Sequence, residues 1–210
     1  PSPFVFGKLH PMAKKTIADV QVENQTVLMR VDFNVPLNEA REITDDRRIE
    51  MALPSIQSVM ERGGKLILMS HLGRPQGQPD SKYSLAPAAK RLAELVDCPV
   101  HFATDTIGDD AISRKSQLAN GEILVLENLR FHSEEKSGDQ EFAKALSAGV
   151  DIYCNDAFSA AHRAHASTEA ITKLMPSCAG RLMAEELSAL ETALGAPRRP
   201  VGAVVGGAKV

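Results

Sequence analysis

Residues 27–37, VLMRVDFNVPL, decide the fold. Their valine, leucine and methionine side chains favour a buried strand over residues 27–33, and Pro36 cannot donate a backbone hydrogen bond to a sheet. The strand is therefore expected to end just before that proline, with Asp32 and Asn34 at its carboxyl end. In open parallel α/β sheets, ligands bind at the carboxyl ends of the strands. Polar groups that follow other strands are expected to meet Asp32 and Asn34 at this edge.

Strands and helices alternate along the rest of the chain. Further strands are expected at residues 65–70, 100–103, 122–126, 152–154 and 198–205. A first helix is expected to start after Thr44 or Asp45, with Pro54 in an early turn or at a kink. Further helices are expected at residues 84–95, 109–118, 140–148 and 181–194, and a charged turn is expected at residues 133–139. The alternation predicts an α/β fold with a doubly wound parallel sheet and helices on both faces, a Rossmann-like three-layer arrangement.

Composition limits the kinds of partner that the chain can bind. The net charge is −3 and the sequence pI is about 6.1, so no overall attraction to nucleic acid or to an anionic membrane is expected. No apolar stretch approaches the roughly 20 residues that span a bilayer. Cys98, Cys154 and Cys178 lack the spacing of a disulfide framework or a zinc site, which favours a reducing, cytoplasmic location.

The chain is expected to hold one complete domain and the beginning of another. Met12 has the character of a natural start, so residues 1–11 are interpreted as an expression or upstream remnant. Residues 12–180 form the expected N-terminal domain, and a helix over residues 181–196 connects it to the next. Residues 197–210 contain a strand and a glycine pair, a pattern that normally leads into a helix. The sequence therefore looks truncated before a second, similar domain.

Segments that leave the predicted sheet at its carboxyl edge carry mostly arginine. These segments, with the start of the helix after the first strand, carry Asp32, Asn34, Arg48, His71, Arg74, Arg130, His132, Asn155, Asp156, His162, Arg163 and His165. Guanidinium groups gathered at one edge repel one another unless an anion lies between them. Guanidinium also suits bidentate contact with phosphate or carboxylate. The inferred ligand is therefore small and multiply anionic.

The residues alone leave several roles open. Asp32 fits a turn cap as well as a ligand contact, and His71 fits a proton donor, a phosphate contact or a loop-packing residue. His162 and His165 have no Cys or Glu at ligand spacing, so no metal site is expected there. The chain also lacks GxxxxGK[ST] and GxGxxG, so a complete nucleotide site of either type is not expected.

Six motifs, in this order and at these spacings, resemble phosphoglycerate kinase. They are RVDFNVPL (30–37), ITDDRRI (43–49), SHLGRP (70–75), ENLRFH (127–132), NDAFSAAHRAHAS (155–167) and GGAKV (206–210). The resemblance implies two similar α/β domains joined by a helix. It implies that the first domain binds 3-phosphoglycerate or 1,3-bisphosphoglycerate. The site for Mg-ATP or Mg-ADP is then expected to lie mostly in the second, missing domain. The resemblance also implies that the whole protein is a cytoplasmic, monomeric glycolytic kinase and that this fragment carries its phosphoglycerate site.

The resemblance also implies a role for each site residue. Asp32 and Asn34 contact the hydroxyl and carboxyl end of the substrate, and Arg48 neutralises the phosphoryl group during transfer. Lys209 guides that group from the nucleotide side. The distal phosphate is held by Arg74, Arg130 and Arg163, with support from His71 through the turn at Gly73.

Two other functions are considered. An aspartyl-phosphate hydrolase would require a second carboxylate two residues after Asp32, where this chain has Asn34. A non-catalytic anion-binding module fits an isolated fragment that lacks the nucleotide domain. A positively charged cage with no obvious base fits phosphoryl transfer best, because an ionised carboxylate attacks a phosphoryl group without a general base.

Overall fold

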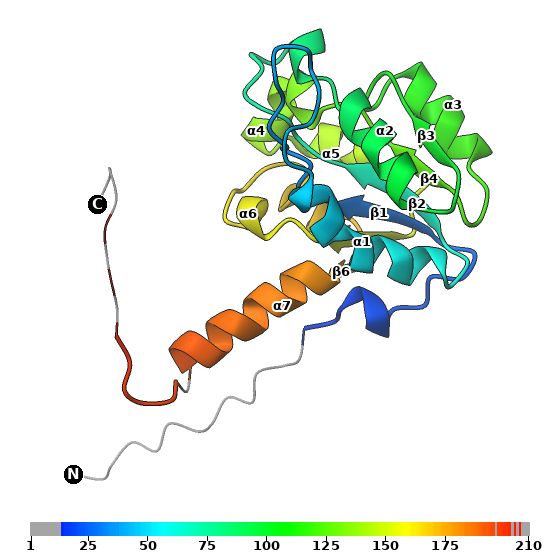
Figure 1. Cartoon of the computed structure of the whole chain (residues 1–210). Coiled ribbons are helices and arrows are strands. Elements are labelled where there is room, and N and C mark those ends of the chain that lie inside the picture. The colour runs from blue at the N-terminus through cyan, green and yellow to red at the C-terminus, as the bar shows by residue number, and fades with distance from the viewer. Residues whose placement is uncertain (1–13, 196, 203, 205, 207–210) are drawn as a thin grey trace.

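The computed structural model describes residues 14–195, 197–202, 204 and 206. Its centre is a sheet of six parallel strands in the order β3-β4-β2-β1-β5-β6 (Figure 1). The strands are β1 (Thr26–Arg30), β2 (Lys65–Met69), β3 (Val100–Phe102), β4 (Ile123–Val125), β5 (Ile152–Asn155) and β6 (Ser177–Ala179). The chain builds outward from β1 on both sides, so β1 and its neighbours meet at the point where ligands bind in such sheets.

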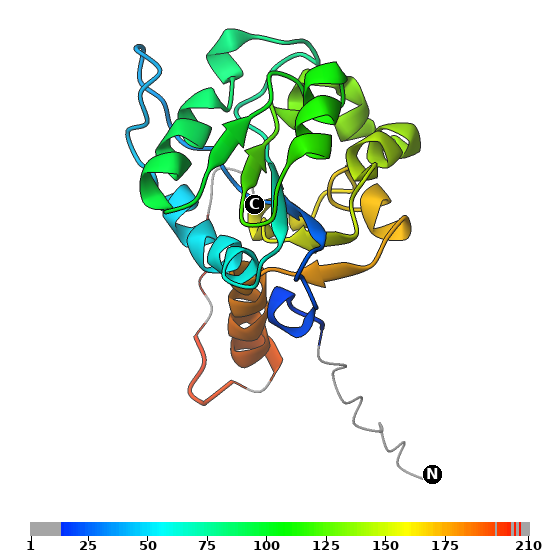
Figure 2. The same cartoon turned by 90° about the vertical axis from the view of Figure 1, so that its right-hand side faces the viewer.

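Helices cover both faces of this sheet. The α-helices are α1 (Arg47–Met60), α2 (Ala86–Leu95), α3 (Asp109–Gln117), α4 (Ser133–Ser137), α5 (Gln140–Ser147), α6 (Phe158–Ala161) and α7 (Arg181–Leu190). Viewed from the β3 edge, α1 and α2 lie on one side of the strands and α5 lies on the other (Figure 2). The doubly wound, three-layer α/β prediction is confirmed.

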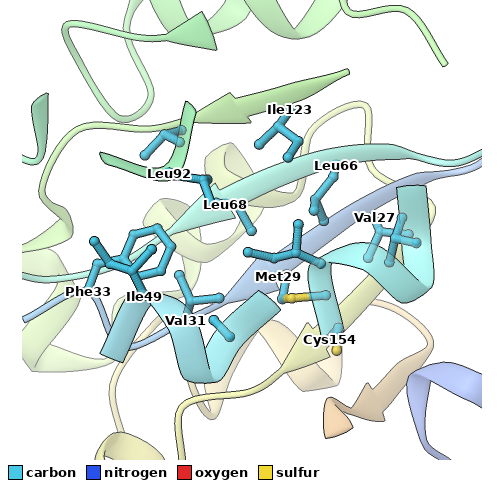
Figure 3. Close-up of a cluster of buried hydrophobic side chains, with 14 of the residues drawn as sticks. Val27, Met29, Val31, Phe33, Ile49, Leu66, Leu68, Leu92, Ile123 and Cys154 are labelled. Atoms are coloured by element: carbon cyan, nitrogen blue, oxygen red, sulfur yellow. The ribbon is translucent and has the colours of Figure 1, made fainter. Parts of the chain in front are cut away.

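Alternate side chains of the central strand serve the two faces. Val27 and Met29 of β1 pack with Ile49 of α1 in one buried cluster (Figure 3). Leu28 points to the other face and packs with Phe142 of α5 in a second cluster. Each fully buried aliphatic side chain contributes about 1.5–3 kcal/mol relative to exposure. Burial on both faces explains why β1 is apolar at nearly every position.

The first strand ends earlier than the sequence suggests. The expected strand covers residues 27–33, whereas β1 ends at Arg30. Val31 still donates to the carbonyl of Met69 at 3.1 Å, but the amide of Phe33 donates to the Ser70 hydroxyl at 2.8 Å. A side chain thus replaces the sheet partner, and the segment beyond turns toward the site.

The structure differs from the sequence expectations at other places as well. The charged turn at 133–139 contains the short helix α4, and β6 was missed because its three residues include only one fully apolar buried side chain, Cys178. Pro54 lies in the interior of α1, so of the two positions expected for it, an early turn or a kink, the early turn is excluded. Among the described residues of 198–205, none is assigned to a strand.

The last helix leaves the body of the domain. Figure 1 shows α7 projecting away from the sheet, and the chain continues from it into a π-helical turn at Glu191–Gly195. Residues 1–11, interpreted as a remnant, lie outside the described residues. In the described part of the chain, no helix combines the length and the apolar character needed to cross a membrane.

Candidate anion site

Loops from four strands are tied together at the carboxyl edge of the sheet. The amide of Leu129, after β4, donates to the carbonyl of Ser70, after β2, at 3.1 Å. The amide of Asp156, after β5, donates to the carbonyl of Arg30 in β1 at 2.8 Å. The structure therefore brings together the segments that the sequence predicted to meet, because the strands that carry them are parallel neighbours.

Asp32 and Arg48 form an ion pair at this edge. Arg48, in the first turn of α1, donates to one Asp32 carboxylate oxygen, which also accepts from the Ser159 hydroxyl at 2.6 Å. The Arg48 side chain is 47% exposed, so it keeps contact with solvent while it is paired. A hollow of about 260 Å³ lies beside this pair, lined also by Asp156 and by Leu182 of α7.

Asn34, Gly73 and Arg130 form a chain of hydrogen bonds. The amide of Gly73 donates to the Asn34 side-chain oxygen at 2.8 Å, and Arg130 donates to the Gly73 carbonyl at 2.7 Å. Gly73 has φ +62°, and a Cβ there would lie 2.4 Å from the Tyr83 ring. The turn therefore requires glycine. Its geometry aligns Asn34 and Arg130 before any ligand binds.

His71 is held as a neutral imidazole. Its ring is buried, and its Nδ1 lies 2.8 Å from a guanidinium nitrogen of Arg30. Because arginine can only donate, Nδ1 accepts, and Nε2 carries the proton. Burial lowers the pKa of His71 to about 2, and the positive charges of Arg30 and Arg130 add to this effect. At neutral pH the neutral ring can donate a hydrogen bond through Nε2, and it carries no extra proton to give up.

Arg30 is a buried charged residue in contact with His71 that the sequence interpretation missed. Its side chain is 1% exposed, and it donates to the Ser167 hydroxyl at 3.2 Å, the Ser70 hydroxyl at 3.3 Å and the Val31 carbonyl. Burial lowers the pKa of Arg30, while the nearby carboxylate of Glu135 raises it. A charged residue inside an otherwise apolar strand was the feature that could have revealed it.

Positive charges accumulate around Arg130. Burial lowers the pKa of Arg130, and the charges of Arg163, Arg30 and Arg74 lower it further. Arg74 and Arg163 are exposed, whereas Arg130 is 6% exposed. We call Arg30, His71, Arg74, Arg130 and Arg163 the basic cluster. The four arginines of this cluster repel one another, and a multiply charged anion between them would relieve that repulsion.

Glu135 provides a negative charge beneath the basic cluster. It lies on α4 and is 1% exposed. One carboxylate oxygen accepts from the Ser167 hydroxyl at 2.6 Å and lies 3.6 Å from Nδ1 of His165. The sequence interpretation missed it because residues 133–139 looked like a solvated turn.

The remaining sequence expectations concern metal ions and the nucleotide. Among them, no group of three or more His, Cys, Asp or Glu side chains could hold a metal ion. Lys209, expected to contact the transferring phosphate, lies outside the described residues.

The fold and the basic cluster together define a class: a three-layer α/β protein with a cluster of arginines at the carboxyl edge of its parallel sheet. Residues 17–210 match the family model described as "Phosphoglycerate kinase". The chain belongs to the phosphoglycerate kinase family.

Individual relatives agree with this placement. A phosphoglycerate kinase of Rhodopirellula baltica is 62% identical over 203 residues, which cover 95% of this chain and 51% of that protein. The Chlorobium limicola enzyme is 54% identical over 200 residues, covering 95% and 50%. The solved phosphoglycerate kinase of Coxiella burnetii superimposes with a TM-score of 0.78 at 34% identity, covering 89% of this chain and 46% of that one. The chain thus spans about half the length of the curated relatives it matches.

Proposed function

We propose that this chain is the phosphoglycerate-binding half of a phosphoglycerate kinase. The whole protein transfers a phosphoryl group reversibly between 1,3-bisphosphoglycerate and ADP, giving 3-phosphoglycerate and ATP. Family membership supports the reaction class. The observation that carries the site assignment is the basic cluster, in which Arg130 donates to the Gly73 carbonyl at 2.7 Å and Arg30 lies 2.8 Å from Nδ1 of His71. Burial lowers the pKa of Arg130, and the nearby charge of Arg163 lowers it further.

The substrate spans the edge from the basic cluster to the ion pair of Asp32 and Arg48. Arg74, Arg130 and Arg163 hold the distal phosphate, because guanidinium forms charge-assisted hydrogen bonds with phosphate oxygens. His71 donates through Nε2 and keeps the Gly73 turn in place. The oxygen of Asn34 is used by that turn, so its amide nitrogen faces the substrate, while Asp32 accepts from the substrate hydroxyl.

Transfer requires charge stabilisation more than proton transfer. In the direction of ATP use, the carboxylate of 3-phosphoglycerate attacks the terminal phosphoryl group and ADP leaves, so no proton has to be removed. Arg48 stands beside the position of the acceptor carboxylate and neutralises charge on the phosphoryl group in flight. Lys209 approaches the same group from the nucleotide side.

Mg-ATP or Mg-ADP binds mainly to a second domain that follows α7, which serves as the connecting helix. Residues 12–180 form the proposed substrate-binding domain. We further propose that the whole enzyme is a cytoplasmic monomer.

Calorimetry on the 210-residue chain tests this function. The chain is expected to bind 3-phosphoglycerate weakly and to release no ADP from ATP in a coupled assay, whereas the full-length protein shows turnover. Lack of phosphoglycerate binding by both proteins would refute the site. Turnover by the 210-residue chain would refute the need for a second domain.

A non-catalytic anion-binding module remains the second candidate for the isolated chain. The observation in its favour is that the chain spans about half of its relatives. Sulfate binding as tight as phosphoglycerate binding would support it, because a specific substrate site should distinguish the two.

A further inference from the structure

Glu135 is buried although it lies on a short, charged surface helix. Its neighbours Glu134 and Lys136 on α4 are exposed, whereas the Glu135 side chain is 1% exposed. A buried carboxylate costs several kcal/mol unless charges and hydrogen bonds compensate it. Its partners therefore indicate what this residue does.

Those partners belong to residues 162–168, which we call the Arg163 loop. One Glu135 oxygen accepts from the amide of Ser167 at 3.0 Å, and the other accepts from its hydroxyl at 2.6 Å. The backbone carbonyl of Glu135 accepts from the amide of Ala166 at 2.9 Å. Three hydrogen bonds from one residue thus fix the end of the loop that carries Arg163.

The loop transmits this constraint to Arg163. The Thr168 hydroxyl, next to Ser167, donates to the carbonyl of Arg163 at 2.6 Å. The Tyr153 hydroxyl donates to the carbonyl of Ser167 at 2.7 Å, so the sheet supports the same point. The guanidinium of Arg163 therefore projects from a segment whose base is held from two sides.

Glu135 also balances the charge of Arg30. The Ser167 hydroxyl that donates to Glu135 accepts from the Arg30 guanidinium at 3.2 Å. Burial raises the pKa of Glu135, but His165, Arg30 and the Ser167 hydrogen bonds lower it more, so the net pKa lies below the usual value. The carboxylate is thus ionised while it holds the loop.

We propose that Glu135 is a positioning residue for the distal-phosphate site, which it aligns by tying the Arg163 loop to the buried guanidinium of Arg30. It does not touch the substrate. This inference rests on the proposed function for its effect on affinity, but the anchoring itself can be measured without a ligand.

Hydrogen exchange on the 210-residue chain tests the anchoring. Glu135→Gln keeps the shape but loses the charge, and Glu134→Gln changes an exposed neighbour on the same helix. We expect amide exchange at Ala166 and Ser167 to rise about 10-fold or more in Glu135→Gln and to stay unchanged in Glu134→Gln. Unchanged exchange in a folded Glu135→Gln variant would overturn the proposal.

A double-mutant cycle tests whether the effect passes through Arg163. We expect Glu135→Gln to weaken 3-phosphoglycerate binding about 10-fold, and the Glu135→Gln/Arg163→Ala pair to bind no more weakly than Arg163→Ala alone. Additive losses would overturn the positioning role, since Glu135 would then act elsewhere. Should Glu135→Gln fail to fold, Ser167→Ala replaces it in both experiments, with an expected loss of about three-fold.

The two proposals can fail separately. If neither the wild-type chain nor the full-length protein binds phosphoglycerate, the proposed function is refuted. The hydrogen-exchange result still shows whether Glu135 anchors the Arg163 loop. If the wild-type chain binds phosphoglycerate but Glu135→Gln binds equally well, the proposed function stands and Glu135 is not a positioning residue.

Discussion

The two ends of the proposed substrate site are held in different ways. At the basic cluster, the Arg163 loop is hydrogen-bonded to the side chains of Arg30 and Glu135. Each of these two side chains is 1% exposed. At the other end, the 47% exposed Arg48 side chain pairs with Asp32 near solvent. Groups that are fixed before binding lose little conformational entropy when the ligand arrives. The buried end suits recognition, and the exposed end leaves Arg48 able to follow a group that moves.

Removal of Arg48 should separate the two ends most clearly. Arg48→Ala in the full-length protein is expected to lower turnover by about 10³-fold or more, because arginine on a transferring phosphoryl group is worth that much in related sites. Phosphoglycerate affinity should change only a few-fold. Coupled-assay kinetics and calorimetry measure the two effects, with Arg47→Ala, which removes an exposed arginine paired with Asp45, as the control. Near-normal turnover would contradict the role given to Arg48.

Removal of Arg163 should affect the other end. Arg163→Ala is expected to weaken 3-phosphoglycerate binding about 10- to 100-fold, since a charge-assisted hydrogen bond contributes roughly 1.5–3 kcal/mol. Calorimetry on the 210-residue chain measures this loss. Arg114→Ala, at a surface ion pair with Asp110, is the matched control. Equal affinities of the Arg163 variant and the wild type would remove Arg163 from the site.

The Gly73 turn offers a test of how rigid the buried end is. Gly73→Ala combines a positive φ with a Cβ 2.4 Å from the Tyr83 ring, whereas Gly121→Ala has a positive φ and no atom within 4 Å. Both variants should be destabilised, and Gly73→Ala should lose about 1–2 kcal/mol more in urea unfolding. Equal losses would mean that the Tyr83 ring moves aside and that the turn is less constrained than its hydrogen bonds indicate.

Asp156, beside the Arg48 end, should give the smallest effect, and it depends on pH. Burial raises the pKa of Asp156 from 3.8 to about 6, so the folded chain binds more protons than the unfolded chain between these values. Its contribution to stability therefore falls as pH rises through this range. Asp156→Asn removes this titration, so the free energy of unfolding of the variant, relative to that of the wild type, should increase by about 1 kcal/mol between pH 4 and pH 7. The full pKa shift would set an upper limit of roughly 3 kcal/mol on this increase.

Urea unfolding at several pH values measures this difference, and Asp97→Asn, at an exposed position, serves as the control. A stability difference that does not vary with pH would show that the Asp156 carboxyl titrates normally.

Periodicity and turn residues predicted most of the fold. Five of the six strands and the main helices follow from apolar runs and glycine punctuation, because burial on both faces of a parallel sheet leaves a clear pattern. The edge strand β6 and the short helix α4 were missed, since three to five residues carry too little pattern. Of the two positions expected for Pro54, the early turn is wrong, because α1 begins at Arg47 and continues past the proline to Met60.

The site was predictable only where its side chains follow strand ends. Asp32, Asn34 and the arginines of the loops could be placed at one edge from topology alone. Arg30 is visible in the sequence only as a charge inside an apolar strand, and its hydrogen bond to Ser167 joins residues 137 positions apart. Glu135 could not be found, because its burial and its bonds to Ser167 appear only in the folded chain. The neutral state of His71 also depends on such neighbours, so the sequence left its role open.

The central position of β1 has a consequence for the order of folding. β1 pairs with β2 through Val27 and Leu66, but it pairs with β5 through Val27 and Ile152. The chain between β1 and β5 is long, so bringing these two strands together is entropically costly, and contacts between residues far apart in the sequence slow folding. The Arg163 loop follows β5, so the basic cluster cannot assemble until this distant pairing forms. Binding of an anionic ligand during refolding would therefore report the completion of the sheet, not an early collapsed state.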